Sequence, residues 1–139
     1  MNTIGQTERL SQNRIVKLFK EQLGYAYYGN WEEREGNSNI EEKYLAGYLH
    51  KQGYNVTEFS KAIYEIKQIA ASFSDDLYIR NKKLYAKLRY GVQVKEDVGT
   101  NYTTVRLIDW ENWENNDFAI AEEVTIKGNR EKRPDIVLY

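Results

Sequence analysis

The sequence predicts an α+β or mixed α/β fold, with helices first and a mostly antiparallel sheet after them. Three observations lead to this prediction. Up to Gly91 apolar residues recur at helical spacing, beyond it short runs rich in β-branched residues alternate with polar ones, and turn residues separate the segments. At 139 residues and 41% hydrophobic content, the chain is long enough for one domain with a core. We predict a helical part at about 7–91 and a sheet part at about 92–139.

Four helices are expected in the first part. The first runs over 7–23, with Thr7 as its N-cap and Gly24 just after its end. Its predicted core-facing residues are apolar and helically spaced: Leu10, Ile15, Leu18, Phe19 and Leu23. The second begins at Asn39, where Glu42 stands three residues on and completes a capping box.

The other two helices follow without a long break. The third is expected from Thr57, with Phe59, Ala62, Ile63, Ile66 and Ile69 facing inward. The fourth is expected over 75–90, capped by Ser74 and ended by Gly91. Its basic residues near the far end fit a solvated helix face better than a DNA contact: Lys82, Lys83, Lys87 and Arg89.

Strand signals fill most of the remainder. Residues 25–31 are short and aromatic, as in an edge strand or an extended segment, and Val92–Glu96 is expected to pair with Thr103–Ile108 around a turn at Gly99. Residues 118–126 and 136–138 predict a second hairpin. Pro134 lacks an N–H, so it can only begin a strand, and this makes Asp135 the first polar side chain of that strand.

Composition excludes several kinds of site. There is no cysteine and a single histidine, so thiolate sites, disulfides and multi-histidine metal clusters are ruled out. The net charge of −1 gives no global sign of nucleic-acid binding. No run is long and apolar enough to span a membrane, no phosphate-cradling loop for ATP occurs, and a cytoplasmic domain is expected. The many tyrosines are predicted to pack in the core.

Four segments together resemble the N-terminal region of the restriction (R) subunit of type I restriction-modification enzymes. They are TERLSQNRIVKLF, YYGNWEEREGNSNIEE, LIDWENWENNDFAIAEEVTIKGN and KRPDIVLY, and they span nearly the whole chain in fixed order. The resemblance implies an α/β fold of the restriction-endonuclease, PD-(D/E)-x-K kind, with a mixed central sheet flanked by helices. It also implies Mg²⁺-dependent hydrolysis of DNA.

The Pro-Asp of that motif matches Pro134-Asp135, so the resemblance makes Asp135 the catalytic and metal-binding carboxylate. A carboxylate at a strand end suits a hard cation, which activates water and stabilises charge at phosphorus. An acidic residue from an early helix often joins it in this class, and Glu41 is in the matching place. Glu41 is equally well explained as a carboxylate favoured by the helix dipole. Glu122 or Glu123, on the preceding strand, is a weaker candidate.

A basic loop precedes Asp135 and is the predicted DNA-contacting segment. Its residues are Lys127, Arg130, Lys132 and Arg133. Cations beside a hydrolytic carboxylate suit phosphate contacts, although an exposed hairpin loop is usually charged in any case.

The family's Glu-x-Lys should lie on the next strand, and the chain stops at Tyr139. We therefore expect a fragment that is inactive alone and incomplete at its C-terminus. Its ATP-driven motor and assembly region would be absent, and its partners would be DNA and the modification and specificity subunits. An open sheet edge would favour self-association. A docking module without chemistry is the alternative, because the loop 109–117 carries Trp110 and Trp113, and tryptophans often anchor interfaces.

Overall fold

The computed structural model describes residues 3–139, and side chains from Thr7 onward. Helices and strands are mixed, as predicted, and the chain divides into two compact units. One unit contains the chain up to Asn39 together with Asp117–Tyr139, and the other is Ile40–Asn116. No helix among the described residues has the length and apolar character needed to cross a bilayer.

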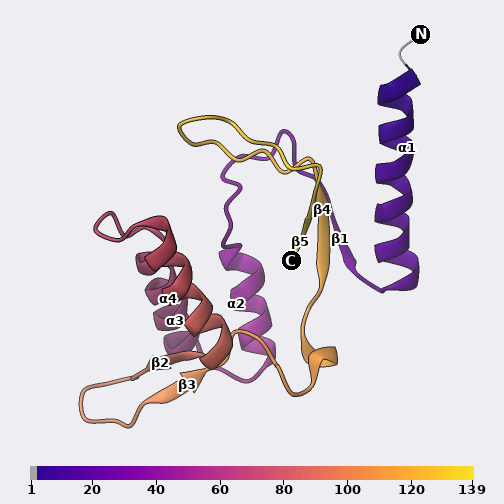
Figure 1. Ribbon diagram of the computed structural model, residues 1–139. Helices are drawn as coiled ribbons and strands as arrows, with labels where there is room; N and C mark the ends of the chain where they lie inside the picture. Colours follow the sequence, from indigo (N-terminus) through magenta and orange to yellow (C-terminus); the bar gives the residue numbers. More distant parts are fainter. Residues whose placement is uncertain (1–2) are drawn as a thin grey trace. The chain divides into compact units, whose positions relative to one another are not determined.

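The first unit holds a three-stranded mixed sheet and an N-terminal helix (Figure 1). Helix α1 spans Thr3–Lys17 and continues as one π-helical segment, η1, over Leu18–Gln22. The strands are β1 (Ala26–Asn30), β4 (Ala119–Glu122) and β5 (Ile136–Leu138). Strand β4 is central, parallel to β1 and antiparallel to β5.

This sheet confirms two predicted strands and corrects two details. The edge strand expected at 25–31 is β1, and the last hairpin is β4–β5. The strand expected to reach Ile126 ends at Glu122 instead, because Glu123 has φ +51°, a left-handed conformation that a strand cannot contain. The sheet is mixed and not mostly antiparallel, because β1 returns from the N-terminus to lie parallel to β4.

Aromatic rings pack the first unit beside β1. The register of β1 and β4 shifts between Tyr27 and Gly29, which forms a β-bulge in β1 at Tyr28. Tyr28 stacks on Trp31 with ring centroids 5.7 Å apart, and Tyr139 lies 5.5 Å from Trp31. Trp31 is buried with Val124. The cluster holds β1 and β5 on either side of the central strand.

The second unit packs three helices on a short hairpin. They are α2 (Glu42–Lys51), α3 (Val56–Ala70) and α4 (Leu77–Tyr90), and the hairpin is β2 (Val92–Val94) with β3 (Thr103–Val105). Antiparallel pairing of β2 and β3 was predicted and is confirmed. The core contains Leu49, Ala62, Ile63, Ile66, Val92, Val94 and Val105. A short 3-10 turn, η2 (Trp113–Asn115), ends the unit.

All four helix starts differ from the predicted ones. Helix α1 begins at Thr3, so Thr7 lies inside the helix and is not its N-cap. Glu41 precedes α2 and makes no side-chain cap, so the capping box expected at Asn39 is wrong. The capping box is at α3 instead. The Asn55 side chain accepts from the Glu58 N–H, and the Glu58 carboxylate accepts from the Asn55 N–H. Asp76, and not Ser74, caps α4 by accepting from the Ile79 N–H at 2.8 Å. At α3 and α4 the side chain that accepts from the first orphan N–H groups marks the start of the helix.

Tyrosine burial is also corrected. Of the twelve tyrosines, seven are exposed: Tyr27, Tyr44, Tyr64, Tyr78, Tyr85, Tyr90 and Tyr102. The core of the second unit is filled by smaller, mostly branched residues of α3, β2 and β3. Most tyrosine side chains therefore lie at the surface.

Candidate functional site

Asp135 lies where the last strand enters the sheet. Its backbone carbonyl accepts from the Glu123 N–H at 2.9 Å, and the Pro134 carbonyl accepts from the Val124 N–H at 3.1 Å. These bonds fix the backbone of Asp135 beside the end of the central strand. The Asp135 side chain is exposed and has no hydrogen-bond or ion-pair partner among the described residues. The carboxylate is therefore held in position by its backbone while its oxygens remain available.

A buried carboxylate stands next to it, at the end of β4. Glu122 is 5% exposed, and burying a charge at this level needs donors around it. The Tyr27 hydroxyl donates to Glu122 Oε2 at 2.5 Å, and Gln12 Nε2 lies 3.4 Å from Oε1. Strand β1 and helix α1 thus each supply a donor to the carboxylate of the central strand.

Gln12 joins this carboxylate to Asp135. Its Nε2 donates to Glu123 Oε1 at 3.2 Å and lies 3.5 Å from the Asp135 carbonyl oxygen. Gln12 is 7% exposed, and Val16, one turn further along α1, is also buried. The inner face of α1 is therefore set by Gln12 and Val16, which corrects the predicted apolar stripe.

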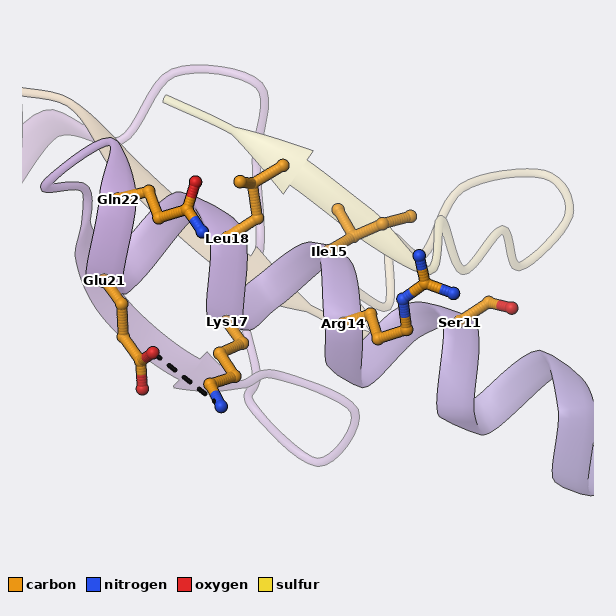
Figure 2. A pocket seen from close by; sticks show the side chains of 7 residues that line it. All are labelled: Ser11, Arg14, Ile15, Lys17, Leu18, Glu21 and Gln22. Carbon is orange, nitrogen blue, oxygen red and sulfur yellow. Dashed lines mark ion pairs between the residues drawn. The ribbon is translucent and has the colours of Figure 1, made fainter.

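That stripe lies on the open side of the helix. Leu10, Ile15, Leu18 and Leu23 are all more than 40% exposed. Ile15 and Leu18 line a hollow of about 570 Å³. Its other lining residues, labelled in Figure 2, are Ser11, Arg14, Lys17, Glu21 and Gln22. The inner face is polar because it meets Glu122 and Glu123, which require hydrogen-bond donors.

Glu123 forms ion pairs with two arginines. Arg133 Nε lies 3.1 Å from Glu123 Oε2, and Arg9 lies 4.0 Å from Oε1. Arg133 also donates to Glu32 at 2.5 Å. One cation of the predicted DNA-contacting loop thus pairs with carboxylates of its own unit. Lys132 lies in an isolated bridge with Ile126, and Lys127 and Arg130 are exposed without an ion-pair partner among the described residues. Their DNA contact stays a prediction.

No cluster of metal-ligating side chains surrounds Asp135 among the described residues. No group of three His, Cys, Asp or Glu side chains that could hold a metal occurs within residues 7–139. Glu122 and Glu123 are engaged by Tyr27, Gln12 and Arg133, which leaves Asp135 as a single available ligand. Glu41 belongs to the other compact unit, where its carbonyl accepts from the Leu45 N–H at 3.0 Å. Its role as a metal ligand stays a prediction.

Tyr27 and Gln12 are the site residues that sequence reasoning missed. Tyr27 stands in an aromatic run that gives no sign of its partner. Gln12 carries a weak signal, since it is four residues from Val16 and the pair defines a helix face. The sequence gives no sign that both side chains contact Glu122, which is 95 residues from Tyr27 and 110 residues from Gln12.

The hydrogen bond to Glu122, together with burial and the charge of Glu122, raises the pKa of Tyr27 to about 12. Because this pKa is raised above the usual value of about 10, its contribution to stability is present below pH 10. That contribution is lost as pH rises through about 12.

We expect Glu122→Gln to bring the Tyr27 pKa back toward 10, because the main cause of the shift is removed. Ring-¹³C-labelled tyrosine, followed by NMR across pH 9–13, measures it. Glu123→Gln is the matched control, since Tyr27 bonds Glu122 and not its neighbour. A Tyr27 resonance that titrates at the ordinary pKa in the unmodified chain would contradict the contact.

Comparison with known proteins assigns the chain to a family. A family model described as Type I restriction enzyme R protein N terminus matches residues 5–139. A relative, the Type I restriction enzyme HindI endonuclease subunit of Haemophilus influenzae, is 33% identical over 76 residues. The match covers 52% of this chain and 7% of the relative, so the chain spans a small part of that protein. No solved structure matches the chain.

Proposed function

We infer the function from the family: this chain belongs to the type I restriction enzyme R proteins, as part of their N terminus, because the family match covers residues 5–139. We propose that it is the nuclease-bearing segment of such an R subunit. In the complete protein it would hydrolyse DNA phosphodiester bonds with Mg²⁺. This segment would have a restriction-endonuclease, PD-(D/E)-x-K architecture, with a mixed sheet such as β1–β4–β5 at its centre.

Asp135 is the observation that carries this proposal. Its carboxylate is exposed and unpartnered at the start of β5, while its backbone is bonded to the end of the central strand. A hydrolytic metal site needs oxygen ligands held rigidly at such a strand end. Asp135 supplies only one ligand, and we propose that a downstream Glu-x-Lys in the complete protein completes the site, with Glu41 of this chain as a further candidate ligand.

This dependence explains why we propose that the segment is inactive alone. The complete subunit would couple cleavage to ATP-driven translocation by a motor outside this chain, and modification and specificity subunits would be its partners. Plasmid cleavage by the complete subunit carrying Asp135→Ala tests the proposal. Cleavage must fall, and cleavage at the parental rate would overturn the role of Asp135.

A second candidate, a docking module without its own chemistry, is favoured by one observation. Trp110 is 50% exposed and Trp113 is 65% exposed on the 109–117 loop. The loop is well built, because Asp109 accepts from the backbone of Glu111 and Asn112. Exposed tryptophans on a fixed loop are typical anchors of protein interfaces.

Under the docking alternative, Trp110→Ala with Trp113→Ala should abolish assembly with the other subunits while the chain keeps its fold. Co-purification of the subunits, with circular dichroism as the folding control, measures both properties. Normal assembly by the double variant would count against the docking alternative.

A further inference from the structure

The outer face of α4 carries a stripe in which tyrosines and basic residues alternate. Tyr78, Lys82, Tyr85 and Arg89 are spaced by four, three and four residues, and this spacing places them on one side of the helix. Tyr78 is 71% exposed and Tyr85 63% exposed, and both basic residues are exposed. We call these four residues the α4 stripe.

The other side of α4 uses its cations for packing. Lys83 pairs with Asp75 at 2.6 Å and Lys87 with Glu65 at 2.6 Å, while Arg80 donates to the Ala70 carbonyl at 3.3 Å. These bonds attach α4 to α3 and to the turn before it, and the two helices lie side by side in Figure 1. The basic residues of α4 therefore divide into three that bond to neighbouring segments and the two of the α4 stripe.

The charge of the stripe is not compensated. Helix α4 contains no acidic residue, and Lys82 has no ion-pair partner among the described residues. Arg89 lies over aromatic rings instead of a carboxylate, 5.3 Å from the Trp110 ring centre and 5.8 Å from that of Tyr90. Trp110 is in turn fixed by its Nε1–H bond to the Leu88 carbonyl at 2.9 Å. The end of the stripe is thus a guanidinium held against a positioned indole.

Alternating aromatic rings and uncompensated cations match one class of partner. Rings with free faces stack on unpaired bases, and neighbouring cations meet the phosphates between those bases. An acidic protein would pair with the cations, and competition by poly-glutamate tests for such a partner. A duplex offers phosphates and keeps its base faces covered. Tyr78 and Tyr85 are seven residues apart, about 10 Å along the helix, with Lys82 between them.

We propose that the α4 stripe binds single-stranded DNA, with bases on Tyr78 and Tyr85 and phosphates at Lys82 and Arg89. The α4 stripe and Asp135 belong to different compact units. Strand binding by the stripe does not require hydrolysis, so it can be measured on this chain whether or not the chain cuts DNA.

Fluorescence anisotropy with a labelled oligo-dT strand tests the proposal on the 139-residue chain. Tyr78→Ala and Tyr85→Ala should each weaken binding by about fivefold or more, since stacking on one ring contributes about 1–3 kcal/mol per base. Lys82→Gln with Arg89→Gln should lower the salt slope of log K by about 1.4, at about 0.7 for each single-strand phosphate.

Matched controls come from the same compact unit. Tyr64→Ala removes a tyrosine on α3 that is 65% exposed, and Lys43→Gln removes an exposed lysine on α2. Neither should change affinity by more than about twofold. Equal losses in the control and stripe variants, or no loss in the stripe variants, would overturn the proposal. Displacement of the strand by equimolar poly-glutamate would also overturn it, because this would show a charge-only surface.

Discussion

Asp135→Ala is expected to reduce DNA cleavage by the complete R subunit by about a thousandfold. That is the scale of loss when one group that stabilises transition-state charge is removed from an active site. The physical reason is the position of this carboxylate: its backbone is fixed to the central strand, and its oxygens face no partner within the described residues. ATP hydrolysis should continue in the variant, because we propose that the motor is a separate part of the protein. A plasmid-cleavage assay run beside a phosphate-release assay measures both.

Glu131→Ala is the matched control for this result. Glu131 is an exposed carboxylate four residues earlier in the same loop, so the control changes charge by the same amount. It should leave cleavage within about twofold of the parent. If Asp135→Ala cuts DNA as well as Glu131→Ala does, Asp135 is a strand-entry residue and the docking alternative gains ground.

Gly91→Ala is expected to destabilise the chain by about 3 kcal/mol or more. Gly91 ends α4 with φ 85° and ψ 177°, a backbone region that is essentially restricted to glycine and costs other residues about 1–3 kcal/mol. An added Cβ would also lie 2.8 Å from Thr104 Cγ2 and 2.9 Å from the Val105 carbonyl oxygen. Val105 is fully buried, so the backbone cannot move aside without disturbing the core, and overpacking adds about 1–3 kcal/mol.

Gly47→Ala provides the opposite case. Gly47 is in the interior of α2, and a Cβ built there meets nothing within 4 Å. Alanine is a better helix former than glycine, so this change should stabilise the chain by about 0.5–1 kcal/mol. Urea denaturation followed by circular dichroism compares the two variants. Similar midpoints for both would show that Gly91 does not have the described conformation.

The strands were the most predictable part of the fold. Pro134 indicated the start of β5, because it has no N–H to donate to the ladder and therefore stands before the strand at Ile136. Alternation around Gly99 predicted β2 and β3, and both hairpins were found. The end of β4 was not predictable, since Glu123 adopts a left-handed conformation that no turn residue announces.

The buried faces of the helices were less predictable, because the segments that pack against a helix decide which of its faces is buried. The apolar residues Leu10, Ile15 and Leu18 predicted the inner side of α1, yet Gln12 lies inward. The carboxylates of Glu122 and Glu123 at the end of β4 need hydrogen-bond donors. This need decides which face of α1 turns toward the sheet. The donor and the carboxylates are more than a hundred residues apart in the chain, so the spacing of apolar residues within the helix cannot reveal this contact.

The site was partly predictable for the same reason. Asp135 was predicted from the Pro-Asp pair and the family resemblance; its side chain is exposed, and its catalytic role stays a prediction. The Tyr27–Glu122–Gln12 contacts depend on the parallel pairing of β1 with β4, which short-range patterns do not encode. Arg133 was expected beside DNA, and its two ion pairs with Glu32 and Glu123 show a structural use of the same charge.

The central claim is that Asp135 is one ligand of a metal site completed by residues outside this chain. Its most direct test is a calorimetric titration with Mg²⁺ and Mn²⁺, without nucleotide, of the complete subunit, its Asp135→Ala variant and this chain alone. The account predicts that the complete subunit binds metal, that Asp135→Ala removes this binding, and that this chain alone binds far more weakly. Equal metal affinity in the complete subunit with and without Asp135 would contradict it.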